Sequence, residues 1–399
     1  MLLRRAAGAL LLVLLAVPAV AQRSGEGPVS AGPGPRVGGE EGSGRVGFQL
    51  GYYQHEDGGG DGNPFLDEDL TVIEPVILFD YDASDRWTVG GLFSYDYVSS
   101  ASIERLSNFP DQSGASRDNY FGLDLHANYR KDRNWTLGGH AGYSIEYDYR
   151  SIGLGLGATQ ELDDADASLS YSLDGYFDSI DVIRFDGTEE GSDSRTSLAG
   201  TVNWYQVLTP RSHGSFGLTL AQQSGFLETP YNAVVVEDGS MPGGNPNLDN
   251  MANGVEITEE LPDTRTRGAL FGRVRTSLGR GKAWELGGRL YADSWGINSL
   301  TVEPRYYFML GDFEWRLRYR LYTQTAADDF QEHVYPPFPA DDEYRTQDSD
   351  LAAFDAHTLG AKWTWFAERD VAYDLSLDYT MRSDGLDQFF ASVGWNWSF

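Results

Sequence analysis

The sequence has no cysteine among its 399 residues and few basic residues, with 30 Lys and Arg against 60 Asp and Glu. Without cysteine the chain can form no disulfide, thiolate nucleophile or zinc-finger site. The formal charge of −30 argues against nucleic acid as a partner, because phosphate binding needs clustered Lys and Arg. The acid excess does not indicate disorder, since 41% of the residues are hydrophobic.

Long apolar runs are missing beyond the N-terminal segment. After residue 21, no window approaches the ~18 apolar residues that a membrane-spanning helix needs. The first 21 residues contain Arg4 and Arg5, an apolar run over 6–17, and the small residues Ala19-Val20-Ala21. This pattern predicts a secretory signal peptide over 1–21 that is cleaved after Ala21. The Gly-, Pro- and Ser-rich residues that follow predict a flexible periplasmic linker over 22–44.

The rest of the chain alternates apolar and polar residues with period two. In 313–323, for example, Arg316, Arg318 and Arg320 occupy alternate positions between apolar residues. Side chains alternate faces along a strand, so this pattern indicates strands with one apolar and one polar face. We expect sixteen such strands, near 45–54, 70–82, 87–98, 119–129, 135–147, 152–162, 167–178, 196–208, 215–224, 266–278, 284–295, 300–310, 313–324, 357–366, 371–382 and 386–399.

The connections between these segments alternate in length. Every second one is a tight turn, and most of the others are long and polar, notably 55–69, 99–118, 179–195, 225–265 and 325–356. Short periplasmic turns, long extracellular loops and an even strand number are typical of outer-membrane barrels. The sequence therefore predicts an all-β fold over 45–399, a transmembrane antiparallel up-and-down β-barrel of about sixteen strands with both termini in the periplasm.

Aromatic residues support an outer-membrane location. Four tryptophans each open a strand after a short turn, which predicts an aromatic belt at the periplasmic interface: Trp87, Trp135, Trp284 and Trp315. The last strand alternates Trp395, Trp397 and Phe399, which looks like the terminal signal read by the outer-membrane insertion machinery. We therefore expect export to the cell outer membrane, with its lipid and lipopolysaccharide as surroundings and that machinery as a partner.

Two stretches carry a family resemblance. The chain reads Trp204-Tyr-Gln-Val-Leu-Thr-Pro210 and then Gly225-Phe-Leu-Glu-Thr-Pro-Tyr-Asn232, and in both it resembles the domain of unknown function 3570 family. Asn232 stands where a basic residue is expected for that family. The resemblance implies an outer-membrane barrel of a Gram-negative bacterium and no activity.

The polar face of the expected strands is highly charged. The basic residues gather on neighbouring strands and form a candidate pore-lining basic wall of Arg273, Arg275, Arg289, Arg305, Arg316, Arg318 and Arg320. The acidic residues elsewhere form a candidate pore-lining acidic wall of Glu74, Asp80, Asp96, Asp124, Glu146, Asp174, Asp178, Asp374 and Asp378. Aligning hairpins about their turns places Arg273 opposite Arg289, and Arg305 opposite Arg318.

Two interpretations of these charges stay open. Opposed basic and acidic walls in a water-filled pore would set ion preference, whereas a paired charge network would pack a closed lumen. Side chains alone no longer fill a barrel of sixteen strands, which favours the open lumen. The apolar start of 225–265 predicts an ordered segment that either folds into the lumen or covers the mouth of the barrel.

Sites for other chemistry are few. Alignment places His140 opposite Asp124 and near His126, an arrangement that suits lumen-facing polar residues better than a metal or catalytic site. The acidic loops 55–69 and 325–356 could hold divalent cations through carboxylate oxygens, although Asp57–Asn63 lacks the distal glutamate of an EF-hand. We predict no catalytic residue, no resident metal and no cofactor.

The sequence thus predicts a porin-like outer-membrane channel for passive diffusion of small hydrophilic solutes or ions, and not an enzyme. The alternative is a non-conducting surface or scaffold barrel whose acidic loops bind a partner or divalent cations. The oligomeric state is not predicted.

Overall fold

The computed structural model describes residues 39–56, 66–67, 69–98, 103–104, 118–162, 166–237, 254–340 and 343–399. The predicted signal peptide, most of the predicted linker and the acidic segment 57–63 lie outside these residues, so they stay predictions.

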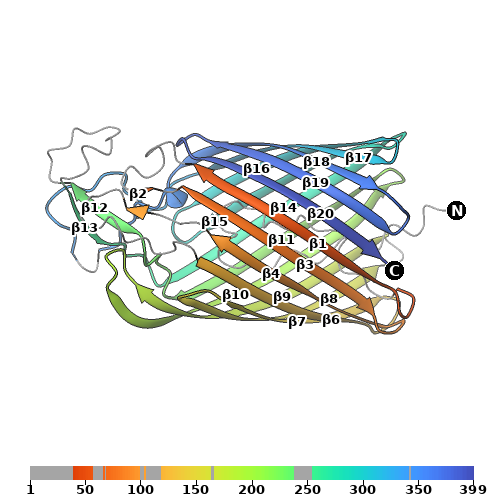
Figure 1. Ribbon diagram of the computed structural model, residues 1–399, viewed down its shortest axis with the longest axis horizontal. Coiled ribbons are helices and arrows are strands. Elements are labelled where there is room, and N and C mark those ends of the chain that lie inside the picture. Colours follow the sequence, from red (N-terminus) through yellow and green to blue (C-terminus); the bar gives the residue numbers. More distant parts are fainter. Residues whose placement is uncertain are drawn as a thin grey trace.

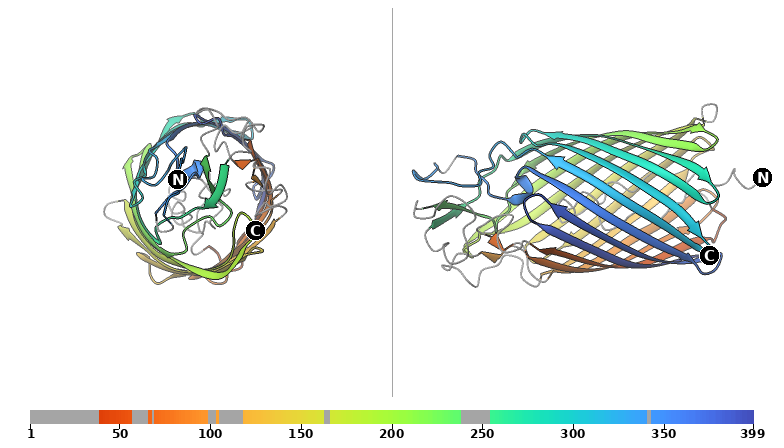
Figure 2. Two further views of the ribbon diagram at one scale, coloured as in Figure 1. Left: turned by 90° about the vertical axis from the view of Figure 1, so that its left-hand side faces the viewer. Right: turned by 90° about the horizontal axis from the view of Figure 1, so that it is seen from above.

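Sixteen strands form a closed antiparallel barrel, as the sequence predicts (Figures 1 and 2). The strands follow each other around the ring in chain order, and the first strand pairs with the last to close it. They are β1 (Gly44–Glu56), β3 (Leu70–Asp82), β4 (Trp87–Val98), β6 (Asp118–Arg130), β7 (Trp135–Ile145), β8 (Tyr149–Leu162), β9 (Ala167–Ile183), β10 (Glu189–Thr209), β11 (Ser212–Gly225), β14 (Thr264–Gly279), β15 (Lys282–Asp293), β16 (Asn298–Leu310), β17 (Phe313–Gln324), β18 (Phe354–Phe366), β19 (Val371–Arg382) and β20 (Asp387–Ser398).

The outer surface of the barrel is apolar. On β8 and β9, Leu154, Leu156 and Leu173 are 52%, 71% and 62% exposed, while Asp174 on the opposite face of β9 is buried. Exposed leucines would be unfavourable in water, but they match a hydrocarbon surrounding, and the closed ring leaves no strand edge unpaired in it. Among the described residues, no helix is long and apolar enough to cross a membrane.

One end of the barrel, which we call the short-turn end, carries tight turns, the predicted tryptophans and the C-terminus (Figure 1). Trp87 and Trp284 are exposed, and Trp87 packs on Tyr129 with ring centroids 4.8 Å apart. Phe399 extends the β1–β20 ladder by exchanging backbone hydrogen bonds with Gly44, of 2.9 and 3.0 Å. A Cβ on Gly44 would lie 2.7 Å from the Phe399 ring, so glycine makes this closure sterically feasible.

The opposite, long-loop end carries further structure that extends beyond the strands (Figure 1). Two small sheets, β12 (Ala233–Glu237) with β13 (Gly254–Thr258) and β2 (Leu66–Asp67) with β5 (Ile103–Glu104), lie here together with the 3₁₀ helix η4 (Ser349–Leu351). The predicted loop 179–195 is wrong in part, because β9 and β10 continue as a paired ribbon and turn only over 184–188.

Candidate functional site

The inner face of the barrel carries the predicted arginines and the predicted acids except Glu146, but the pairing of these charges differs from the prediction. On β14 and β15, Arg275 faces Glu285 and Arg273 faces Gly287, so the predicted pairing of Arg273 with Arg289 is wrong. The register moves because the connecting turn is only Arg280-Gly281, and Gly279, Arg280 and Gly281 all take positive φ beside a β-bulge. On β16 and β17, Arg305 faces Arg318 as predicted.

The basic strands β14 to β17 carry their own acids. Arg305 contacts Glu285 at 3.3 Å and also pairs with Glu303. Arg273 lies 3.4 Å from Glu285, and Arg318 reaches Glu303 at 3.8 Å and Asp378 at 2.9 Å. The result is a ladder of alternating charges from β14 to β19, which removes most of the repulsion between stacked arginines.

Aromatic rings support other members of the basic set. Arg275 lies over Tyr307 at 4.0 Å from the ring centroid, Arg289 over Tyr291 at 5.5 Å and Arg320 over Tyr322 at 5.5 Å. Arg316 is neighboured by Arg305 and Arg318 on the same face. Two of the seven arginines remain open to solvent: the Arg273 side chain is 44% exposed, and Arg289 is also exposed.

Three of the acidic residues pair with basic residues that the sequence pattern did not place in the lumen, namely Arg45, Arg195 and Lys362. Asp80 pairs with Arg45 at 2.6 Å and with His126 at 2.9 Å. Asp178 pairs with Arg195 at 2.7 Å. Arg45 and Arg195 were missed because single basic residues on separate strands give no local cluster in the sequence.

Two acids of the predicted acidic wall lie beside the basic strands instead of across the lumen from them. Asp374 and Asp378 are on β19, two strands from β17, where Asp378 pairs with Arg318 and Asp374 with Lys362 at 3.0 Å. Glu146 follows β7 at the long-loop end and lies at the rim. The predicted acids that lie away from the basic strands β14 to β17 are therefore those on β3, β4, β6 and β9.

Glu74 and Asp96 form the least compensated part of the acidic set. They lie between the paired positions Val72–Val98 and Val76–Ser94 of β3 and β4. Oδ1 of Asp96 is buried and has no hydrogen-bond partner among the residues that the structure describes.

His140 bridges two acidic strands. Its Nδ1 lies 2.7 Å from Asp124 and its Nε2 lies 3.0 Å from Asp174, although the residue directly opposite it is His126 and not Asp124 as predicted. Gly155 leaves the space that the imidazole occupies, because a Cβ there would overlap Nε2 of His140. Within the described ranges, no group of three or more His, Asp or Glu side chains could hold a metal ion.

The long-loop end is covered by what we call the cap, formed by the described parts of 226–263 and 325–353 (Figure 2, left). In it, Val235 N donates to Gln347 at 2.7 Å, and Val234, Val236 and Val334 form a buried cluster. The apolar start of 225–265 is therefore ordered, and it packs with 325–353 at the mouth of the barrel, not across the middle of the lumen. Nothing in the sequence pattern pairs these two loops.

A buried carboxyl lies inside the cap. Glu259 is 1% exposed, accepts a hydrogen bond from Thr229 N at 2.8 Å and another from the Thr346 hydroxyl at 2.6 Å. Burial, with a smaller contribution from the nearby Asp348, raises the pKa of Glu259 to about 8.

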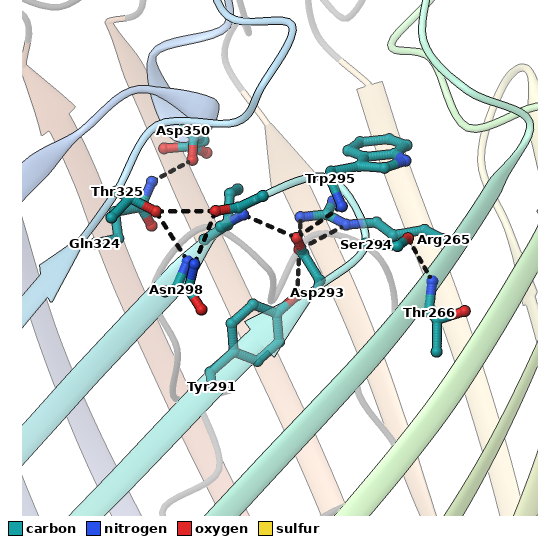
Figure 3. A network of polar contacts seen from close by, with 12 residues as sticks. Arg265, Thr266, Tyr291, Asp293, Ser294, Trp295, Asn298, Gln324, Thr325 and Asp350 are labelled. Carbon is teal, nitrogen blue, oxygen red and sulfur yellow. Dashed lines mark hydrogen bonds and ion pairs between the residues drawn. The ribbon is translucent and has the colours of Figure 1, made fainter.

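A network of polar contacts joins the cap to the rim of the barrel (Figure 3). Asp293 accepts from Trp295 N and Ile297 N through Oδ1, both at 3.0 Å, and from Tyr291 and Arg265 through Oδ2. Arg265 also lies 4.1 Å above the Trp295 ring, and Trp295 packs in a buried cluster with Leu261 and Leu351 of the cap. The short β15–β16 connection thus anchors the cap.

Comparison with known proteins identifies the family. A model of the family described as protein of unknown function (DUF3570) matches residues 107–389. The chain belongs to this family. No curated protein matches it.

Solved structures with a similar fold are outer-membrane barrels of low sequence identity. The monoaromatic hydrocarbon channel CymD is 10% identical, with a TM-score of 0.41 over 90% of this chain and 89% of that chain. OccAB1 of Acinetobacter baumannii is 8% identical, with a TM-score of 0.44 over 90% and 96%. OpdK of Pseudomonas aeruginosa, solved with vanillate, is 9% identical, with a TM-score of 0.41 over 90% and 100%.

Proposed function

We propose that the protein is a porin-like channel of the outer membrane that lets small hydrophilic solutes or ions diffuse passively. The observation that carries this proposal is the solvent exposure of Arg273 and Arg289 on the inner face of β14 and β15. An arginine in the middle of a filled barrel would be buried against other side chains. Solvent-exposed arginine side chains on the inner face of β14 and β15 fit a water-filled passage along these strands.

The ionic surroundings give that passage an ion preference. The exposed arginines lie on β14 and β15, while most of the predicted acids lie on β3, β4, β6 and β9, away from them in the strand order. Opposed potentials of this kind orient dipolar solutes and select ions by sign.

The absence of cysteine allows a direct test. In Arg289→Cys the new thiol is the chain's only one, and we expect a membrane-impermeant methanethiosulfonate reagent to change the current through the channel in a planar bilayer. A cationic reagent should restore the ion preference of the parent, and an anionic reagent should move it toward cations. The cysteine-free parent should not respond. Current that is unaffected by complete modification of the introduced thiol would contradict the proposal.

The cap favours a second candidate, a non-conducting surface barrel. It packs over the mouth through the contact of Val235 with Gln347 and the valine cluster of Val234, Val236 and Val334. In that case a membrane-inserted protein would carry no current until the cap is released, and the acidic long-loop end would bind a partner or divalent cations. The bilayer experiment distinguishes the two candidates.

A further inference from the structure

The long-loop end contains a cavity that the proposed channel does not explain. It has a volume of about 400 Å³ and lies between the β9–β10 turn, strand β13 and the residues Phe338, Pro339 and Arg345. Its lining includes Arg184, Glu190, Glu256, Ile257, Phe338 and Arg345. The volume falls in the range of small-molecule sites, which bury an apolar body and fix it with a few polar groups.

Both arginines of this cavity already donate hydrogen bonds to acceptors of the protein itself. Arg184 donates to Glu190 and to Glu228, both at 2.8 Å. Arg345 is buried and donates to three backbone carbonyls, those of Thr258, Ala340 and Glu343. These arginines therefore build the walls of the cavity and leave little capacity for an anionic ligand.

Glu256 is the group that lacks a counterpart. Its Oε1 is buried from solvent and has no hydrogen-bond partner in the part of the chain that the structure describes. A buried carboxylate oxygen without a hydrogen-bond donor is costly. A ligand that brings a donor to this carboxylate would offset that cost.

Apolar surface lines the same cavity as this carboxylate. Phe338 is 55% exposed and lines the cavity together with Ile257, Phe185 and Pro339. An exposed ring beside a carboxylate suits a cation with an aromatic or aliphatic body, because the ring face attracts the positive charge and the body covers the apolar surface.

We propose that this cavity is a binding site for small organic monocations, with the ammonium group on Glu256 and the apolar body against Phe338. The site lies outside the lumen, and its occupancy does not depend on whether the barrel conducts.

Ligand-observed NMR with the purified full-length protein in detergent tests this proposal, with three probes of similar size: phenethylamine, phenylacetate and 2-phenylethanol. We expect saturable binding of the amine, weaker binding of the alcohol and none of the anion. Glu256→Gln should weaken amine binding roughly tenfold, since it removes one charge-assisted hydrogen bond, and should leave the alcohol unchanged. Phe338→Ala should weaken both.

Glu189→Gln is the matched control, because Glu189 is an exposed carboxylate at the start of β10 that does not line the cavity. It should leave binding of all three probes unchanged. Equal loss of amine binding in Glu189→Gln and Glu256→Gln would overturn the proposal in favour of a general effect of net charge. Preferential binding of phenylacetate, or no saturable binding of the amine to a protein that is folded by its gel mobility, would overturn it as well.

Discussion

At the residue scale, the inner face depends on small residues that make room for large polar ones. Gly155 lies where His140 bridges Asp124 and Asp174, and Gly360 lies where Asp378 meets Arg318. In the sequence, the run Gly153-Leu-Gly155-Leu-Gly157 shows only alternation with small inward residues. Which large side chain fills the space follows from the neighbouring strands, so the sequence could not reveal it.

The space beside His140 leads to a prediction about stability. Gly155→Ala should force the imidazole away from Asp174 and break its two-carboxylate bridge, at a cost of about 1–3 kcal/mol as for other overpacked sites. The folded form should therefore convert to the unfolded form at lower temperature in a gel-mobility assay. Gly200→Ala is a control, because its Cβ would meet only Ser172 O at 3.9 Å, and it should leave the conversion temperature nearly unchanged. Equal temperatures for both variants would contradict the account of the bridge.

The two exposed arginines lead to a prediction about ion preference. Replacing Arg273 and Arg289 with alanine should leave insertion intact, because lumen substitutions alter selectivity more than stability. The reversal potential across a salt gradient should shift toward cations, since the acids on β3 and β4 remain. Arg211→Ala in the exposed β10–β11 turn should cause no shift. A reversal potential that is the same in all three proteins would count against an arginine-lined passage.

At the scale of elements, the strands were predictable and the cap was not. Period-two alternation predicted all sixteen strands, because each strand meets lipid on one side and polar groups on the other. The residue pairing of β14 with β15 differs from the prediction because the turn between them is only Arg280-Gly281. The cap has no such alternation: the partnership of Val235 with Gln347 and of Glu259 with Thr346 joins residues far apart in the chain.

Glu259 makes the cap sensitive to pH. Burial raises its pKa from 4.5 to about 8, so between these values the packed cap holds a proton that the open loop has released. The stability of the cap is therefore greatest below pH ~4.5 and falls as the pH rises through about 8. Hydrogen exchange of 229–237 and 345–348, corrected for intrinsic rates, should accelerate between pH 6 and pH 9.

Two variants check the origin of that pH dependence. Glu259→Gln keeps the shape of the side chain without its charge and should make the corrected exchange rates nearly independent of pH. Glu343→Gln, an exposed residue on the same segment, should behave as the parent. The explanation would be wrong if Glu259→Gln kept the full pH dependence.

The last strand links an element to assembly. Phe399 pairs with Gly44 through the backbone and packs on Trp397 with ring centroids 4.8 Å apart. Removing Phe399 should lower the amount of protein in the outer membrane and increase its degradation in the periplasm, as measured by fractionation. Phe399→Ala removes the exposed ring and keeps the backbone pairing with Gly44. This variant therefore shows which of the two acts in assembly. Unchanged membrane levels after the deletion would show that the terminal strand does not act as the assembly signal.

At the scale of the whole molecule, the structure combines a barrel of sixteen strands, a paired charge ladder and a cap. The sequence predicted the barrel because its period repeats in every strand, and it identified part of the inner charges, including the arginines of β14 to β17. It could not predict the balance between those charges, since Arg45, Arg195 and Lys362 act as single counterions on different strands. We propose that this balance leaves a conducting path.

Single-channel recording in a planar bilayer with the purified protein shows whether ions pass through the barrel. Folding of the barrel is first established by the different gel mobility of heated and unheated protein. We expect discrete current steps at neutral pH in a potassium chloride solution, with an ion preference set by the exposed arginines of β14 and β15. Inserted, folded protein that gives no current steps, at neutral pH and at pH 9 where the cap is weakest, would contradict the channel function.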